Sequence, residues 1–451
     1  MAKVRKNFET SKRSGLKVVN FHAAGIDISP KEMQVCVPVE SAEENNRTFG
    51  VYTKDLQAIA SWLKECEVTT VAMESTGVYW IPLFGVLKDA GFEVLLVDPK
   101  QVKNYSGKKT DETDAEWLRM LHSYGLMKSC YQPENIIRQI RNLARHRDNL
   151  IKSSSREVLH LQKEMEQMNL KLDNVFSDIL GKSGQAIITA ILNGERDAEK
   201  LAALADYRCK KSHEEIVASL QATYDEGHLF VMQQSQNLYL YYQKQIAECE
   251  AKIEELLKTH PVLIDDVQDL PRSNKQSRYH NDVTFDIEQY AYRLWGVNAM
   301  RLPGLNKNAL LRLTSELGAD FVAKFGDARR FTSWANLVPN NKISGGKLLS
   351  SRVPNRKNPV GQIFRQSANS LWRSQGPMGD YFRSMRARKG HLAAMVATGH
   401  KLATIFFTMV EKRQEYDEKI YARHHKLEVE RQIQRTQAKL ARLEREYQEV
   451  A

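Results

Sequence analysis

Residues 22–130 alternate between two kinds of sequence pattern, and this alternation constrains the fold more than any other feature of the chain. Short runs rich in β-branched residues predict strands, and segments with an apolar residue at every third or fourth position predict helices. The predicted order is three strands, a helix, a strand, a helix, a strand and a helix. An antiparallel meander followed by β–α units is typical of a ribonuclease-H-like fold. We therefore predict an α/β domain over residues 22–130.

Four acidic residues follow this predicted framework. Asp27 ends the first predicted strand in GIDIS, and Glu74 ends a later one in AMEST. Asp111 and Asp114 lie three residues apart at the start of the last predicted helix, and residues at that spacing share one helix face. In this fold the first strand is central, the strand with Glu74 is its neighbour, and the last helix packs across both. All four carboxylates are therefore expected to converge.

Converging carboxylates repel one another unless a cation neutralises them. A ligand set made only of oxygen atoms suits Mg²⁺ or Mn²⁺, and two such ions can stabilise the attacking and leaving oxygens of a phosphoryl transfer. The four acids thus predict a metal site that cuts or joins nucleic-acid backbones. The alternative is that Asp111 is a helix N-cap and that Asp114 interacts with the helix dipole. Asp98, at a further strand end, is a rival fifth acid, which we predict either to support the metal ligands from behind or to be structural.

The remaining sequence predicts helices, so the fold class is α/β plus α. Residues 131–260 have apolar residues at helical spacing, which predicts two long helices that return on each other or pair with a partner as a coiled coil, with a small helical bundle between them. Residues 261–295 are predicted to be an irregular connector, and residues 296–420 a mostly helical domain. A basic arm is predicted over residues 1–21, and a charged helix over residues 421–451.

The charge balance indicates a polyanionic partner. The chain has 66 Lys and Arg against 55 Asp and Glu, a net charge of +11, which favours nucleic acid or an anionic membrane. No uninterrupted apolar run reaches the roughly 18 residues that a spanning helix needs, so nucleic acid is the better prediction. The five cysteines are scattered with no C-x-x-C pair. This argues against a zinc site or a disulfide framework and fits a reducing cytoplasm.

The basic residues concentrate around a serine–glycine motif. From Lys342 to Lys389 there are eleven Lys and Arg and a single acid, so this stretch is predicted to neutralise nucleic-acid phosphates. Within it, KISGGK places Ser344 before two glycines that remove steric bulk beside its hydroxyl. From the residues alone the motif is either a turn that touches phosphate or a nucleophile, because no activating base is fixed by spacing; Ser350 and Ser351 are nearby competitors for the role of nucleophile. The predicted phosphate-binding residues are Lys342, Lys347, Arg352, Arg356, Lys357 and Arg365.

These motifs together resemble those of the DEDD transposases of the IS110 insertion sequences. GIDIS, AMESTGVYW and KTDETDAEWL are similar to the amino-terminal half of that family, and RLPGLNKNALLRLTSELG and FTSWANLVPNNKISGGK are similar to its carboxy-terminal half. The resemblance runs from about residue 22 to about residue 420. The segment SSRVPNRKNP departs from the more usual basic, glycine-rich run after the serine motif.

The resemblance implies a RuvC-like domain, a coiled-coil middle and a transposase domain. It implies that Asp27, Glu74, Asp111 and Asp114 are the catalytic DEDD residues that bind Mg²⁺, and that Ser344 is the nucleophile that forms a phosphoserine link to DNA. It further implies a recombinase, acting on the bacterial nucleoid, whose non-coding bridge RNA pairs with both donor and target DNA. The family works as a homodimer that assembles to a tetramer, with active sites shared between subunits.

Two other functions remain alternatives on the residues alone. A metal-dependent nuclease that resolves branched DNA would need only the four acids, with water as the nucleophile. A coiled-coil nucleic-acid scaffold with a degenerate acidic site would need no catalysis. Replacement of Ser344 separates the first alternative from the recombinase, and replacement of Asp27 tests the second.

Overall fold

The computed structural model describes residues 17–105, 113–261, 270, 281–354 and 357–419, together with short stretches between residues 430 and 448. The chain divides into two compact units, Met1–Gln132 and Pro133–Ala451, and each is described by itself. Most of the predicted basic arm over 1–21 and of the predicted tail helix over 421–451 lies outside the described residues.

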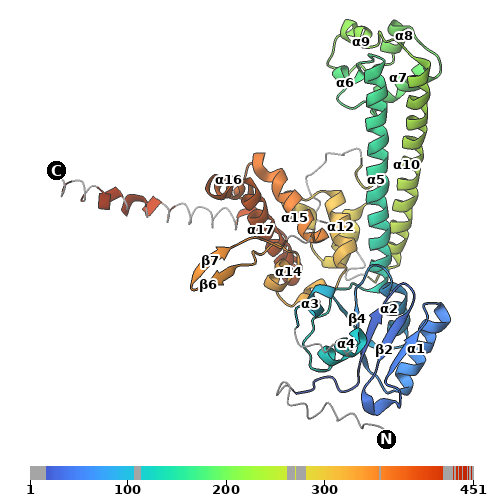
Figure 1. Cartoon of the computed structure of the whole chain (residues 1–451). Coiled ribbons are helices and arrows are strands. Elements are labelled where there is room, and N and C mark those ends of the chain that lie inside the picture. Colours follow the sequence, from blue (N-terminus) through green and yellow to red (C-terminus); the bar gives the residue numbers. More distant parts are fainter. Residues whose placement is uncertain are drawn as a thin grey trace. The chain divides into compact units, whose positions relative to one another are not determined.

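The first unit contains a five-stranded mixed sheet with the order β3-β2-β1-β4-β5 (Figure 1). β1 pairs antiparallel with β2 and parallel with β4, so β1 is central and β4 is its neighbour, as predicted. β3 lies antiparallel to β2, and β5 lies parallel to β4. The strands are β1 Ala23–Ile28, β2 Met33–Cys36, β3 Asn46–Phe49, β4 Thr70–Glu74 and β5 Glu93–Val97.

Helices cover both faces of this sheet, as a ribonuclease-H-like domain requires. Ile26 and Met73 point into the core beneath α1 and α2, whereas Ala72 packs with the residues of α4. Successive strand residues point to opposite faces, so Asp27 and Glu74 belong to the α4 face. The helices are α1 Thr53–Glu65, α2 Trp80–Asp89, α3 Pro99–Lys103 and α4 Asp114–Ser123.

The second unit begins with two long helices that pack along each other, α5 (Asn135–Gln167) and α10 (Glu226–Thr259) (Figure 1). The prediction that they return on each other is confirmed, while a coiled coil stays a prediction. A buried ion pair joins them, because Arg147 Nε lies 2.6 Å from Glu250 Oε1 and each side chain is only 2% exposed. Glu250 Oε2 also accepts a hydrogen bond from the Thr284 backbone N–H at 3.0 Å.

A small helical bundle joins the far ends of α5 and α10, as predicted. Its core contains Ile187, Ile191, Leu201 and Leu220, which are fully buried. The bundle helices are α6 Leu172–Val175, α7 Lys182–Leu192, α8 Ala198–Ala202 and α9 His213–Ser219.

The rest of the second unit is a helical domain with one small hairpin. Its centre is aromatic: the rings of Phe321 and Phe406 stack at 5.5 Å, and Trp295 meets Phe406 edge-on at 5.1 Å. The elements are α11 Ile287–Trp295, η3 Ala299–Arg301, α12 Lys307–Leu317, α13 Phe321–Phe325, α14 Ala328–Trp334, β6 Lys342–Ser344, β7 Lys347–Ser350, α15 Pro359–Ser370, η4 Leu371–Arg373, α16 Pro377–Lys389 and α17 His391–Lys412.

The prediction of an irregular connector over residues 261–295 is wrong for its last part. Residues Ile287–Trp295 form the helix α11, which has its apolar residues on one buried face and Asp286 as its N-cap. Among the described helices, α17 is the one long and apolar enough to cross a membrane, and just over half of it is buried. It packs against α14, α15 and α16, which is the position of a core helix.

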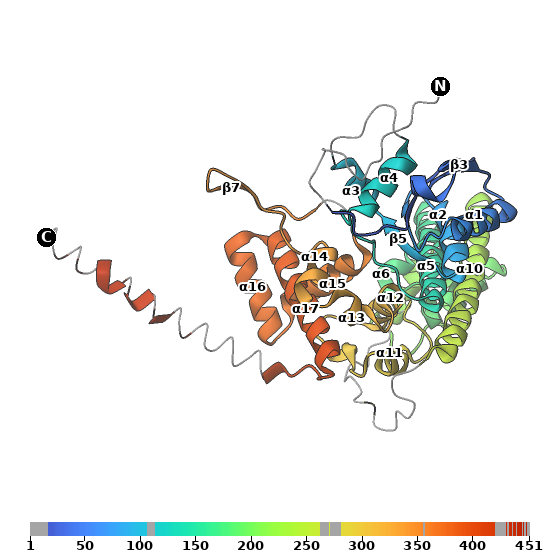
Figure 2. The same ribbon diagram turned by 90° about the horizontal axis from the view of Figure 1, so that it is seen from below.

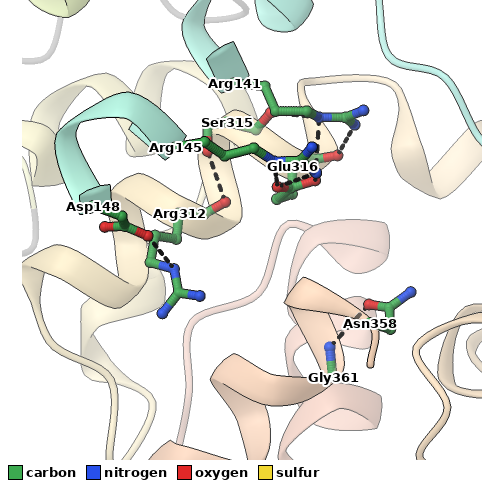
Figure 3. A network of polar contacts seen from close by, with 8 residues as sticks. All are labelled: Arg141, Arg145, Asp148, Arg312, Ser315, Glu316, Asn358 and Gly361. Atoms are coloured by element: carbon green, nitrogen blue, oxygen red, sulfur yellow. Dashed lines mark hydrogen bonds and ion pairs between the residues drawn. The ribbon is translucent and has the colours of Figure 1, made fainter. Parts of the chain in front are cut away.

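A polar network fixes α12 against α5 (Figure 3). Glu316 on α12 accepts hydrogen bonds from Arg145 at 2.9 and 3.0 Å, and its carboxylate lies 3.1 Å from Arg141 Nε. Arg312 pairs with Asp148 one turn further along, at 3.3 Å. The α11–α17 domain is therefore joined to the long helices by several charged pairs.

Candidate active site

Asp27 and Glu74 lie on neighbouring parallel strands of the first unit. Ile26 of β1 is paired with Met73 of β4, which brings the next residue of each strand to the same level. Both acids follow the alternation that directs them to the α4 face. Glu74 is the last residue of β4 and is half-buried. The two carboxylates therefore meet at the carboxyl end of the sheet, where β4 ends.

α4 packs against β1 and β4, and its first residue is Asp114, so Asp114 lies on the same face of the sheet as Asp27 and Glu74. Thr113 caps the helix: its hydroxyl accepts from the Glu116 N–H at 3.2 Å, and Glu116 accepts from the Thr113 N–H at 2.9 Å. Asn46 on β3 donates to the Thr113 hydroxyl at 3.0 Å, which ties the start of α4 to the sheet.

Gly25 sets how closely α4 approaches β1. A Cβ placed on Gly25 would lie 2.3 Å from the Ala115 carbonyl oxygen and 2.3 Å from the Arg119 backbone nitrogen. Only a glycine fits beneath this helix. Since Gly25 is two residues before Asp27, it faces the same way, and its lack of a side chain keeps Asp114 near Asp27.

The electrostatics agree with a cluster of three carboxylates. Burial raises the pKa of Glu74, and the charges of Asp27 and Asp114 raise it further. The Thr76 hydroxyl, which donates to Glu74 Oε2 at 3.3 Å, and the Lys103 ammonium act in the opposite direction. Like charges disfavour ionisation of a nearby carboxyl group, so Asp27 and Asp114 both act on Glu74 through their charges.

Asp111, the fourth predicted acid, lies outside the described residues, which resume at Thr113. The described helix α4 begins at Asp114 and has Thr113 as its N-cap. The predicted placement of Asp111 beside Asp114 stays a prediction. Within the described residues, no three His, Cys, Asp or Glu side chains approach closely enough to hold a metal ion.

Asp98 has a structural role, which is one of the two that the sequence allowed. It is the N-cap of α3 and accepts from the Lys100 N–H at 3.1 Å. Sequence reasoning missed Lys103 on this short helix and Thr76 after β4, the two groups that moderate the pKa of Glu74. The sequence did contain a signal for the helix that carries Lys103, because Asp98 followed by Pro99 is typical of a helix start.

Ser344 lies on an exposed hairpin of the second unit. β6 and β7 pair antiparallel with Ser344 opposite Lys347, and Gly345 and Gly346 form the turn with φ of 54° and 72°. A two-residue turn with both φ positive suits a tight hairpin, and glycine adopts it without strain. The hairpin, which Figure 2 shows projecting from the helical domain, was not predicted. Ser344 is thus the strand residue before the turn and is exposed.

The predicted phosphate-binding residues fall into two groups. Lys342, Lys347, Arg352 and Lys357 are exposed on or near the hairpin. Arg365, in contrast, is half-buried, and its guanidinium donates to the Asn336 carbonyl at 2.5 Å. Burial also lowers its pKa. Arg356 lies outside the described residues.

Comparison with known families gives two matches. Residues 24–170 match a model of the DEDD transposases of IS110, described as a transposase. Residues 298–383 match the model of the IS116/IS110/IS902 transposase family. Together the matches span just over half of the chain, and they include Asp27, Glu74, Asp114 and Ser344. No curated protein matches the chain.

Proposed function

The chain belongs to the IS110 family of transposases, and from this premise we propose that it is an RNA-guided DNA recombinase that uses Ser344 as its nucleophile. Membership of the family implies DNA substrates and a DEDD-type domain that cuts and rejoins them. The observation that carries the proposal is the placement of Asp27 and Glu74 at the ends of paired strands and of Asp114 at the start of α4, within the part that matches the DEDD model. Such a cluster of acids is the feature that phosphoryl transfer requires.

The carboxylates fit a divalent metal ion, which domains of the DEDD type use. The donor atoms are all oxygens. Burial and, to a lesser degree, the charges of Asp27 and Asp114 raise the pKa of Glu74, and a bound cation would offset the effect of those charges. We propose Mg²⁺, held by Asp27, Glu74, Asp111 and Asp114. When bound, the ion supplies Lewis-acid stabilisation of the charge that develops at the scissile phosphate.

The proposed reaction is a pair of transesterifications. Ser344 Oγ forms a bond to the scissile phosphorus, the bond from phosphorus to the 3′ oxygen breaks, the serine proton passes to a base, and the 3′ oxygen takes up a proton. The freed 3′ hydroxyl of one DNA then attacks the phosphoserine of the other and releases the serine. One phosphoester replaces another in each step, so no nucleotide cofactor is consumed.

The position of Ser344 supports this role. Its strand is exposed, so an extended DNA backbone can reach the hydroxyl, and Lys347 lies opposite it in the hairpin. A lysine ammonium there can balance charge on the attacked phosphate. The glycines of the turn have open space around them, so they add no bulk beside the serine.

RNA guidance and subunit sharing complete the proposal. Base pairing with a bridge RNA would select donor and target sequences, while the exposed basic residues around the hairpin would bind backbone. The acids belong to one compact unit and Ser344 to the other. Separate units suit a homodimer or tetramer in which one subunit supplies the acids and another the serine.

The first experiment is purification from cells that carry the flanking DNA of the gene, with sequencing of any RNA that copurifies. One structured RNA with defined ends and loops that match two DNA sequences is the expected result and identifies the substrates. Only random cellular RNA, or none, would contradict RNA guidance.

The second experiment tests the nucleophile with those substrates. Wild-type protein should form a detergent-resistant adduct with DNA that maps to Ser344 by mass spectrometry. Ser344→Ala should abolish the adduct, whereas the matched control Ser350→Ala, at the end of β7, should retain it. Full cleavage by Ser344→Ala without an adduct would support water as the nucleophile and a branched-DNA nuclease instead. Asp27→Asn should lose cleavage at unchanged DNA affinity, which a non-enzymatic scaffold would not do.

A further inference from the structure

η4 and α16 carry a second basic surface that the serine hairpin does not include. From Leu371 to Lys401 there are six Lys and Arg and one acid, Asp380. Asp380 is already paired with Arg383 within α16. Within this segment, positive charge therefore outweighs negative charge, and the Glu418 carboxylate lies beside Gly376 at the start of α16 rather than at its basic end.

Trp372 organises this surface. Its side chain is 39% exposed, and the guanidinium groups of Arg373 and Arg386 lie over its ring, 4.5 and 5.4 Å from the ring centroid. Stacking on an indole uses the flat face of a guanidinium and leaves the N–H groups at its edge for other acceptors. The indole thus holds two arginines side by side with their donors available for a ligand.

Arg383 fixes the backbone beneath this pair. It donates to the Trp372 carbonyl at 3.2 Å and to the Ser374 carbonyl at 2.7 Å, besides its pair with Asp380. These bonds tie η4 to α16, so Trp372 and Arg386 keep their relative position. A preorganised cationic site loses less side-chain entropy on binding than one made of flexible lysines.

The helix dipole explains only part of the arrangement. Arg386, Arg388 and Lys389 lie in the last turn of α16, where cations interact favourably with the helix C-terminus. Arg373 lies on η4 instead, so this effect does not account for its position. Nor does it account for a large aromatic side chain that stays exposed and is covered by two arginines.

We propose that Trp372, Arg373, Arg386, Arg388 and Lys389, which we call the tryptophan patch, bind the phosphates of duplex DNA. The patch offers charged N–H donors, which suit phosphate oxygens. Its aromatic ring is taken up by guanidinium groups, so the patch does not offer a bare ring on which an unstacked base could lie. The choice of DNA as the partner rests on the proposed function, whereas the choice of phosphates rests on the patch itself.

The test compares two doubly substituted proteins of equal charge. Arg373→Gln/Arg386→Gln removes two positive charges from the tryptophan patch, and Lys244→Gln/Lys252→Gln removes two from α10, where both lysines pair with glutamates. The probe is a linear duplex DNA of arbitrary sequence, with affinity measured against salt concentration. The plot of log affinity against log salt concentration has a negative slope, and the loss of two phosphate contacts should make that slope less steep by about 2. The affinity lost between about 50 and 200 mM salt should then be roughly tenfold smaller than in the wild type.

Trp372 gives a second variant that keeps all the charges. Trp372→Ala should weaken duplex binding because its arginines lose their support, and Trp372→Phe, which retains an aromatic face, should restore most of the affinity. Melting temperatures of all variants show whether the fold is kept. An RNA hairpin of equal length is the comparison probe. Because its stem also presents phosphates, its affinity should fall by no more than that of the duplex DNA.

Three results would overturn the proposal. These are an unchanged salt slope in the Arg373→Gln/Arg386→Gln protein, an equal fall in the α10 control, and a loss confined to the RNA hairpin. The outcome is independent of the nucleophile. If the Ser344 adduct forms while the salt slope stays unchanged, only the patch is disproved; if no adduct forms while the slope falls, only the recombinase mechanism is.

Discussion

Gly25→Ala is the most informative single change in the acidic domain, because it adds one methyl group beneath α4. That methyl would lie 2.3 Å from the Ala115 carbonyl oxygen and the Arg119 nitrogen, and 2.9 Å from Arg119 Cα. These are backbone atoms, which cannot turn aside as the end of a side chain does. To regain ordinary contact the helix must withdraw by about 1 Å.

The withdrawal should affect both stability and catalysis. Overpacking of this kind costs about 1–3 kcal/mol of unfolding free energy. Because α4 carries Asp114, a shift of about 1 Å at a reacting site should slow DNA cleavage by about 100-fold. The pKa of Glu74 should also fall towards its ordinary value, since the charge of Asp114 would lie further away and burial would be reduced. Urea unfolding, single-turnover cleavage and NMR titration of Glu74 measure the three effects.

Gly85→Ala on α2 is the matched control. A Cβ there meets no atom within 4 Å, so the change should leave cleavage unaltered and stabilise the helix by up to about 1 kcal/mol. If Gly25→Ala cleaves DNA and unfolds like the wild type, α4 does not rest on Gly25, and our account of how Asp114 is positioned is refuted.

Three further predictions concern other parts of the chain. Arg147→Met should lower the unfolding free energy by about 3–5 kcal/mol, because it leaves Glu250 buried without its partner, and Arg147→Met/Glu250→Leu should recover much of that loss in urea titrations. Gly346→Val should reduce formation of the Ser344 adduct with little change in melting temperature, because a β-branched residue at φ 72° strains only the exposed turn, by about 1–2 kcal/mol. Glu74→Gln should raise the melting temperature at pH 7 while abolishing cleavage. Burial and nearby acids raise the pKa of Glu74, so the folded state binds the proton of the Glu74 carboxyl group more tightly than the unfolded state does. The stability of the wild type should therefore fall as pH rises from the ordinary pKa of glutamate to the raised pKa. A difference in melting temperature between wild type and variant that stays constant across that pH range would contradict this reasoning.

Much of the acidic domain could be predicted because its signals are local. The alternation of residues along β1 and β4 defines which face Asp27 and Glu74 occupy, and the order of elements places those strands together. The start of α4 could also have been predicted, because Thr113 and Glu116 form a threonine-x-x-glutamate capping box. We instead predicted a start at Asp111, because we gave more weight to the acids in that segment.

The parts that escaped prediction depend on contacts between distant residues. The approach of α4 to Gly25 joins residues about 90 positions apart, and no local pattern reports it. Likewise Arg365 looks like any other basic residue until the Asn336 carbonyl occupies its guanidinium. The hairpin is an exception, because two glycines between short β-rich runs are a local turn signal that the basic character of the segment obscured.

The buried pair of Arg147 and Glu250 has a consequence for α5 and α10 as a mechanical element. If the helices slid past each other by one turn, both charges would be buried without partners, so the pair permits a single alignment. α5 has 33 residues and is therefore about 50 Å long. Because this alignment is fixed, the α6–α9 bundle stays at a constant distance from the contact between α5 and α12, about 33 Å along α5 from Arg145 to Gln167.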